Sequence, residues 1–397
     1  MVTNTGDSFW KEIAQEFPAC REVRYLNTGT IGIMPRCVLS KMVSLAYSYY
    51  LAGPARIDVS SEANDALIQA KGFLAKIIGC NTEDLAFMVN TTEGINAVLM
   101  SLPWKPGDVI ITSDTEHPAV RVPLLYLELK KAVKVIAVPA RCAPPDEGSL
   151  EKAFRDAPGT VRAVVMSHVS YATGMLTDIS SLARICHRHG AVFLVDGAQS
   201  AGAVVLDLDK TEVDAYAFPG YKWLLGPEGT GGLYLSPRLR EQIEPSRAFP
   251  DSFKEEPGSP PVLRREAGAY QTSTPPRLNY AALGWAAAFL LDVGMQRITD
   301  RCRILARMFK EEISSVGGFG VVTAVEPERS LGLVSFTING FGLDDYLRTV
   351  QYLYRHNRIV IRAVGNPPAL RASFHLYNTE EDVLHLVTAL KDLKLEA

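Results

Sequence analysis

Lys222 is the residue whose surroundings most clearly predict chemistry. It follows a short apolar stretch near 213–217 and precedes a glycine-rich segment that leads into a second apolar stretch at 231–235. This pattern predicts a lysine held on a rigid turn between two strands. Partial burial lowers the pKa of such an amine, and the neutral amine can attack a carbonyl group. Most lysines are solvated surface charges, so the inference depends on the residues that accompany this one.

An aspartate ends the apolar run that precedes Lys222. Residues 191–195 are all apolar and predict a buried parallel strand, with Asp196 at the carboxyl end, where open α/β sheets bind ligands. A carboxylate there could face the ring nitrogen of pyridoxal phosphate (PLP) and keep it protonated, so that the ring accepts electrons. The alternative is an aspartate that caps the next helix. Gln199 could donate to the phenolic oxygen of PLP or simply cap a turn.

Two other predicted strands end at polar residues. Thr91 and Thr92 follow a strand at 85–89 and begin a helix, whose free N–H groups and dipole favour a phosphate. An ordinary capping box explains the same letters. His117 follows the apolar strand at 108–112, and its ring could stack on a planar cofactor or belong to a plain loop histidine.

These segments, in this order, resemble the class V aminotransferase family. That family includes cysteine desulfurases, cystine and cysteine-conjugate lyases, and isopenicillin N epimerase-like proteins. The matching segments cover almost the whole chain: YLNTGTIG (25–32), NTTEGINAV (90–98), EHPA (116–119), SHVSYATG (167–174), VDGAQSAG (195–202), GYKWLLGPEGTGGLY (220–234), TSTPP (272–276) and LRASFHLYNTEEDV (370–383).

The resemblance implies PLP as the cofactor and assigns its contacts. Lys222 would hold PLP as a Schiff base, the internal aldimine. Asp196 would pair with the ring nitrogen, His117 would stack on the ring, and Gln199 would contact the phenolic oxygen. Residues Thr91 and Thr92 would bind the phosphate.

Two further features follow from the same resemblance. Ser273 and Thr274 match a turn that reaches the phosphate of the neighbouring subunit, which implies a homodimer with shared active sites. Arg371 matches the arginine that grips the carboxylate of an amino-acid substrate, and a bidentate pair of this kind gives both charge and orientation.

Substrate specificity is expected in four places: residues 25–32, residues 53–56, the long excursion at 246–276, and Tyr171. Asn27 and Thr30 are the candidate substrate contacts in the first of these. Arg56 could meet a second substrate carboxylate or be a plain surface arginine. Tyr171 could touch the cofactor or the substrate, or it could serve packing alone.

The chain departs from the family pattern at three positions. Tyr221 stands before the lysine where histidine is usual; it can donate to a phosphate but carries no positive charge. Pro219 stands where a small polar residue is frequent, and Tyr171 replaces the asparagine typical of desulfurases.

The most decisive departure is a missing cysteine. Desulfurases need a nucleophilic cysteine on a mobile loop before the carboxylate arginine, and residues 354–371 contain none. The sequence therefore predicts a PLP-dependent lyase that breaks a carbon–sulfur bond of a cysteine-derived substrate by β-elimination, and not a persulfide-forming desulfurase. Transamination, epimerisation or decarboxylation of a specialised amino acid is the alternative. A PLP-fold scaffold without catalysis is disfavoured, because Lys222, Asp196 and Arg371 are all retained.

Composition narrows the remaining classes. The 397 residues are 47% hydrophobic and 21% charged, with a formal net charge of −3, which gives no basic excess for nucleic acid. No apolar stretch is long enough to span a membrane, and the N-terminus lacks the apolar core of a signal peptide. The six cysteines lie far apart without metal-ligand spacing. We therefore expect a cytoplasmic protein with reduced thiols and no metal site.

The order of elements predicts an α/β protein. Seven apolar strands alternate with helical segments, as in a mainly parallel sheet covered on both faces. The resemblance implies the fold-type I architecture of PLP enzymes: a large PLP-binding domain at 20–276 and a smaller α+β domain at 277–397, on which residues 1–19 would pack.

Overall fold

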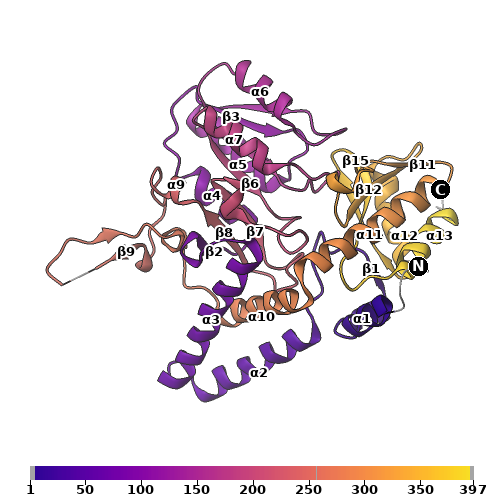
Figure 1. Cartoon of the computed structure of the whole chain (residues 1–397), viewed down its shortest axis with the longest axis horizontal. Coiled ribbons are helices and arrows are strands. Elements are labelled where there is room, and N and C mark those ends of the chain that lie inside the picture. The colour runs from indigo at the N-terminus through magenta and orange to yellow at the C-terminus, as the bar shows by residue number, and fades with distance from the viewer. Residues whose placement is uncertain (1–4, 256, 394–397) are drawn as a thin grey trace.

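The chain forms a large α/β body joined to a smaller α+β body (Figure 1). The computed structural model describes residues 5–255 and 257–393. The large body contains a seven-stranded sheet of order β2-β8-β7-β6-β5-β3-β4. Strand β8 is antiparallel to β2 and β7, and the other neighbours are parallel. The strands are β2 (Leu85–Phe87), β3 (Val109–Ser113), β4 (Lys134–Val138), β5 (Val161–Ser167), β6 (Val192–Asp196), β7 (Ala215–Pro219) and β8 (Gly231–Leu235).

Helices cover both faces of this sheet because its strands are apolar on both sides. Phe193 and Val195 pack in one hydrophobic cluster, while Val192 and Leu194 of the same strand pack in another. The first cluster includes α3 (Ile57–Ile78), α6 (Glu147–Arg155), α7 (Ile179–Arg188), α8 (Leu208–Thr211) and α10 (Arg277–Val293). The second includes α4 (Thr91–Leu99), α5 (Pro118–Lys131) and α9 (Pro237–Arg240). The predicted mainly parallel sheet and α/β fold are confirmed.

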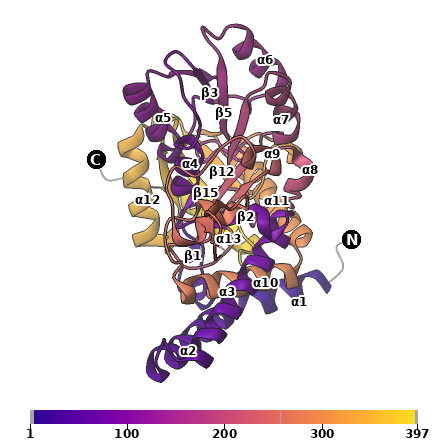
Figure 2. The same cartoon turned by 90° about the vertical axis from the view of Figure 1, so that its left-hand side faces the viewer.

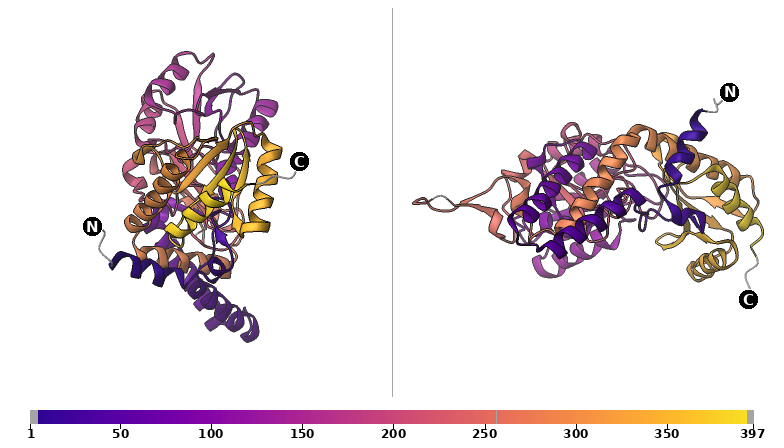
Figure 3. Two further views of the ribbon diagram at one scale, coloured as in Figure 1. Left: turned by 90° about the vertical axis from the view of Figure 1, so that its right-hand side faces the viewer. Right: turned by 90° about the horizontal axis from the view of Figure 1, so that it is seen from below.

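The smaller body, orange to yellow in Figure 3, has an antiparallel sheet. Its strand order is β11-β12-β15-β14. Its strands are β11 (Phe319–Val321), β12 (Leu333–Ile338), β14 (Arg362–Gly365) and β15 (Pro368–Ser373). Its core joins this sheet to α11 (Met295–Ser314), α12 (Leu343–Asn357) and α13 (Glu380–Lys391). Leu305, Phe309 and Phe336 are fully buried there.

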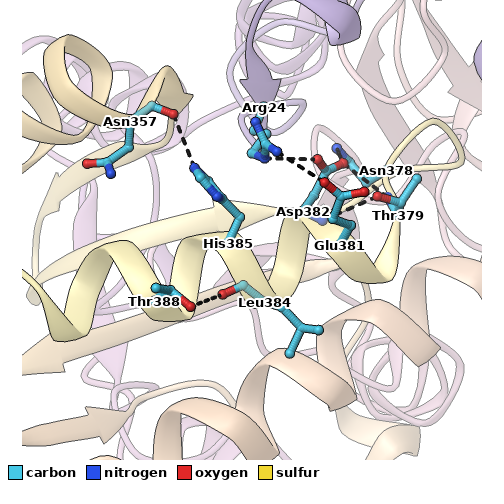
Figure 4. Close-up of polar contacts among 9 residues, drawn as sticks. All are labelled: Arg24, Asn357, Asn378, Thr379, Glu381, Asp382, Leu384, His385 and Thr388. Carbon is cyan, nitrogen blue, oxygen red and sulfur yellow. Dashed lines mark hydrogen bonds and ion pairs between the residues drawn. The ribbon is translucent and has the colours of Figure 1, made fainter.

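The N-terminal segment contacts both bodies, since Phe9, Trp10 and Ile13 pack against the first hydrophobic cluster. The packing of residues 1–19 on the smaller domain stays a prediction. Arg297 and Arg301 of α11 lie over the rings of Phe9 and Trp10 in α1 (Thr5–Ala14). Strand β1 (Arg24–Tyr25) pairs in parallel with β13 (Ile359–Val360). Figure 4 shows Arg24 directed at Glu381 and Asp382 in the first turn of α13.

The connection between the two bodies is made by α10. Its buried residues Tyr280, Leu283 and Leu290 share the first hydrophobic cluster with Ala70 and Leu74 of α3. This helix therefore packs with the large body, and the division at residue 277 stays a prediction.

Two segments project from the large body. Helix α2 (Arg36–Ala52) extends with α3 as a helical hairpin (Figure 2). The excursion at 246–276 carries a small hairpin, β9 (Phe253–Lys254) with β10 (Val262–Leu263), that reaches away from the sheet (Figure 1). Within the described residues, no single helix is long and apolar enough to cross a membrane. The α10–α11 pair meets that test only jointly, with a 79° bend.

A pair of glycine substitutions tests the α3–α10 contact. A Cβ on Gly284 of α10 would lie 2.5 Å from the Cα of Ala70, whereas a Cβ on Gly72 of α3 meets nothing within 4 Å. We expect Gly284→Ala to lower the free energy of unfolding by about 1–3 kcal/mol through overpacking. Gly72→Ala should raise it by about 0.5–1 kcal/mol. Urea denaturation measures both changes. Equal stability of the two variants would contradict this packing.

Candidate active site

The turn that carries Lys222 is fixed from two directions. The N–H of Gly32 donates to the carbonyl of Tyr221 at 2.8 Å, and Nε2 of His375 donates to the carbonyl of Trp223 at 3.0 Å. A Cβ on Gly32 would lie 2.1 Å from the carbonyl oxygen of Lys222, so only glycine allows this approach. Lys222 therefore lies on a turn whose backbone is held in place, as the sequence predicts.

Gln199 also stabilises the turn that carries Lys222. Its Oε1 accepts from Nε1 of the fully buried Trp223, and its Nε2 donates to the carbonyl of Gly29, both at 2.9 Å. These two partners fix the orientation of the amide, because an indole N–H only donates and a carbonyl only accepts. One amide hydrogen of Gln199 remains for the phenolic oxygen of a cofactor.

Lys222 has an environment suited to a reactive amine. Burial lowers its pKa to about 8, the nearby carboxylate of Asp196 opposes this shift, and the guanidinium groups of Arg371 and Arg362 add to it. An appreciable neutral fraction near pH 7–8 follows. The pKa of the amine therefore reflects both the carboxylate and the two arginines.

Asp196 keeps one acceptor unused. It is 3% exposed at the end of β6, where one carboxylate oxygen accepts from the N–H of Ala198 at 2.8 Å. Its other oxygen has no hydrogen-bond partner among residues 5–255 and 257–393. Burial raises the pKa of Asp196, while Ala198 and Lys222 lower it.

His117 is the N-terminal cap of α5 rather than a free loop residue. Its Nδ1 accepts from the N–H of Ala119 at 3.1 Å, so a proton on the neutral ring sits on Nε2. Burial, followed by the charge of Lys222, lowers its pKa to about 4. The ring of Tyr171 meets it edge-on, with ring centroids 4.8 Å apart. His117 is thus neutral, with an aromatic neighbour on its edge.

The start of α4 presents unsatisfied donors. Asn90 caps the helix by accepting from the N–H of Glu93 at 2.9 Å. The hydroxyl of Thr91 is buried without a hydrogen-bond partner in the described part of the chain, while Thr92 is exposed. A buried unpaired hydroxyl at a helix N-terminus suits a phosphate oxygen.

Two of the three remaining phosphate candidates are exposed in this chain. Ser273 and Thr274 are exposed next to Thr272, whose hydroxyl donates to Glu93 at 2.9 Å. No hydrogen bond joins either residue to Lys222 within the described ranges. Tyr221 is half-buried, which raises its pKa. The assignment of these three residues to a phosphate stays a prediction.

Arg371 is a buried cation without an anionic partner. It is 1% exposed on β15; Nη1 donates to the carbonyl of Tyr171 at 3.0 Å and Nη2 to the hydroxyl of Thr30 at 3.1 Å. Its Nε is buried with no acceptor, and no carboxylate of the described chain pairs with it. Burial, followed by the charge of Arg362, lowers its pKa to about 9. Such a group is expensive to bury unless a carboxylate ligand completes it.

Arg362 is a site residue that the sequence analysis missed. It lies directly opposite Arg371 in the β14–β15 pair, and its Nη1 donates to the same Thr30 hydroxyl at 3.2 Å. That hydroxyl in turn donates to Oδ1 of Asn27 at 2.7 Å. Asn27 and Thr30 thus orient two like-charged arginines. The register of the β14–β15 pair brings these positions together, and the sequence alone does not give that register.

A second missed residue is Glu116, which is 2% exposed beside His117. Its carboxyl group accepts hydrogen bonds from Ser113 and Ser167. By contrast, Arg56 is exposed between α2 and α3, where it forms a bidentate pair with Asp58 at 3.1 and 2.6 Å. The structure does not bring Arg56 to Lys222 within one chain.

The residues present fit PLP. A lysine amine with a lowered pKa, a carboxylate oxygen without a partner, a neutral imidazole and an unpaired hydroxyl at a helix start match the aldehyde, ring nitrogen, ring face and phosphate of PLP. The unpaired arginine adds a place for the carboxylate of an amino acid.

Comparison with known proteins agrees with this donor set. The family model for aminotransferase class V matches residues 24–386. The chain belongs to this family. It is therefore a PLP-dependent enzyme, and the predicted resemblance is confirmed.

Curated relatives align over nearly the whole chain. A probable cysteine desulfurase of Methanothermobacter thermautotrophicus is 26% identical, covering 96% of this chain and 98% of the relative. The isopenicillin N epimerase of Streptomyces clavuligerus is 28% identical, covering 97% and 98%. Relatives with different activities are about equally similar to this chain. The comparison therefore identifies the family but not the reaction.

Solved structures support the fold and the cofactor of this class V enzyme. A lysine-to-alanine variant of C-DES, with glycine covalently linked to its PLP, superimposes with a TM-score of 0.87 at 27% identity, covering 96% of this chain and 99% of that one. A complex of the cystine C–S lyase C-DES with its product cysteine persulfide gives 0.86 at 27% identity, covering 95% and 99%.

The unpaired guanidinium group gives a test of the site. We expect Arg371→Met to raise the free energy of unfolding of the ligand-free enzyme by about 1–3 kcal/mol, because a buried cation is removed. The KM for an amino-acid substrate should rise about a hundredfold. Arg362→Met is the control, since Arg362 is exposed and its stability change should stay within about 0.5 kcal/mol. If Arg371→Met lowers the free energy of unfolding and leaves the KM unchanged, the substrate carboxylate binds elsewhere.

Proposed function

We propose that this class V enzyme cleaves a carbon–sulfur bond of a cysteine-derived amino acid by β-elimination. The observation that carries the proposal is the hairpin before Arg371. Strands β14 and β15 are joined by a tight turn at 365–368, with no cysteine, where a desulfurase needs a nucleophilic thiol. The similarity to the cystine C–S lyase C-DES, at 27% identity, is consistent with this reaction.

Each site residue has a role in that reaction. PLP supplies an electron-accepting ring that makes the α-proton of a bound amino acid acidic. Lys222 would hold the cofactor and then take the α-proton on Nζ, for which a pKa near 8 is suitable. Asp196 would keep the ring nitrogen protonated with its free oxygen, and the neutral ring of His117 would stack on the cofactor. Arg371 would orient the substrate carboxylate.

The thiols of the chain argue against a persulfide formed on a cysteine of the enzyme. Burial raises the pKa of Cys20 and Cys302 to about 12, which leaves almost no thiolate. Cys142 is the exposed thiol of the described chain, on the loop after β4. Its neighbour Arg141 donates to Asn366 of the β14–β15 turn at 3.1 Å, so Cys142 is the residue to exclude by experiment.

Epimerisation is the second candidate. Isopenicillin N epimerases align over 97% of this chain at 28–29% identity. Inversion needs an acid on the face opposite the lysine, and Tyr171 has a phenol without a hydrogen-bond partner among the described residues. Aminotransferase and decarboxylase activity stay open in the same proposal.

A homodimer completes the proposal. The solvent side of α2 is apolar at helical spacing, with Leu39, Val43, Tyr47 and Leu51 between 47% and 79% exposed. An apolar stripe of this size favours association. A second copy on this face would agree with the exposed Ser273 and Thr274 reaching the neighbouring phosphate.

Sedimentation velocity tests the dimer. We expect Tyr47→Asp to convert the dimer to a monomer, because a charge in the middle of the α2 stripe cannot be desolvated without a partner. Leu384→Asp on α13, where Leu384 is 46% exposed, is the matched control and should stay dimeric. A dimer that survives Tyr47→Asp would remove α2 from the interface.

The reaction is tested with the PLP-loaded enzyme and a panel of cysteine, cystine and cysteine S-conjugates. We expect pyruvate and one equivalent of the sulfur leaving group, which is sulfide from cysteine, cysteine persulfide from cystine and a thiol from an S-conjugate. Lys222→Ala should lose both turnover and the absorbance of the lysine-bound cofactor. Cys142→Ser should turn over normally.

Three outcomes are informative. Loss of activity in Cys142→Ser would favour a persulfide route through that thiol. A change in cofactor absorbance without pyruvate would favour epimerisation, transamination or decarboxylation. A Lys222→Ala variant that keeps turnover would remove the lysine assignment.

A further inference from the structure

Glu116 is a buried carboxyl group without a cationic partner in the described chain. One oxygen accepts from the hydroxyl of Ser113 at 2.7 Å and the N–H of Ser167 at 3.0 Å, and the other accepts from the hydroxyl of Ser167 at 2.5 Å. It is 2% exposed. Three hydrogen-bond donors thus satisfy this buried carboxyl group, which indicates a specific structural role.

These hydrogen bonds connect the strand ends that hold the catalytic groups. Ser113 ends β3 and Ser167 ends β5, and Ser167 pairs in register with Asp196 at the end of β6. Glu116 is also joined by a peptide bond to His117. The carboxyl group of Glu116 thus links the turn of His117 to β5, the strand next to Asp196.

The carboxylate of Asp196 acts on Glu116. Burial raises its pKa to about 7, with a further contribution from the carboxylate of Asp196. Asp196 is the charged group that faces it; the other groups around it are the hydroxyls of Ser113, Thr115 and Ser167. Hydroxyls can turn from donor to acceptor, so Glu116 can gain or lose a proton in place.

We propose that Glu116 is a positioning residue of the cofactor site. It holds the turn of His117 against the end of β5, and its negative charge favours the protonated form of the lysine-bound cofactor next to Asp196. This rests on the proposed placement of PLP between His117 and Asp196. Glu116 itself touches neither cofactor nor substrate in this arrangement.

Two substitutions separate geometry from charge. Glu116→Gln keeps the shape, since its oxygen can accept from Ser167 N–H and its amide can donate to the Ser167 hydroxyl. We expect PLP affinity within about threefold of wild type, and a pH midpoint of the lysine-bound cofactor absorbance that is lower by about half a unit or more, because a negative charge is lost. Glu116→Asp keeps the charge but shortens the reach; PLP affinity should fall about tenfold, the loss of one hydrogen bond to a charged group.

The controls make the result decisive. Glu12→Gln, an exposed glutamate of α1, should change neither the affinity nor the midpoint. Ser167→Ala removes one donor to Glu116 and replaces Glu116→Asp if that variant does not fold. Ser167→Ala should weaken PLP binding and lower the pH midpoint of the absorbance. Glu116 variants that match Glu12→Gln in both measurements would overturn the proposal. PLP affinity and absorbance do not depend on the reaction, so failure of the lyase assay would leave this test intact.

Discussion

The site depends on a concentration of positive charge that the protein does not neutralise itself. Arg371 and Arg362 lie close enough to lower the pKa of Lys222, Arg362 also lowers the pKa of Arg371, and Asp196 is the anion that acts on the lysine. A buried cation without a partner opposes folding. The surrounding structure must therefore hold it by packing and by neutral acceptors, such as the carbonyl of Tyr171. In the proposed function, the phosphate of PLP and the carboxylate of a substrate would supply the missing negative charge.

Rigid contacts between the two bodies make this arrangement possible. His375 of the smaller body donates to the carbonyl next to Lys222, and Nδ1 of the same ring accepts from the N–H of Leu376. Arg371 is held by the carbonyl of Tyr171 from the large body. The amine and the guanidinium group therefore have positions set by both bodies together, and a displacement of one body would move the substrate carboxylate relative to the base.

Sequence patterns were sufficient for the sheet and for the residues at its carboxyl edge. Unbroken apolar runs that end at Asp196 and before Lys222 predict buried strands, and parallel strands bring such ends together. The patterns could not show Arg362 or Glu116 as site residues. One depends on the register of a hairpin and the other on hydrogen bonds between separate strands. The pairing of Arg56 with Asp58 also depends on local geometry that the letters leave open.

In the proposed function, substrate binding would change the strength of the base. The charge of Arg371 lowers the pKa of Lys222 in the free site. A substrate carboxylate paired with Arg371 would cancel that charge, so the pKa of the lysine would rise once the α-carbon is in place. The lowered pKa would help the amine to take up the cofactor, and the higher pKa would help it to remove the α-proton afterwards. An unpaired arginine near the lysine would thus couple recognition of the carboxylate to the proton transfer, which a lysine paired permanently with an acidic side chain could not do.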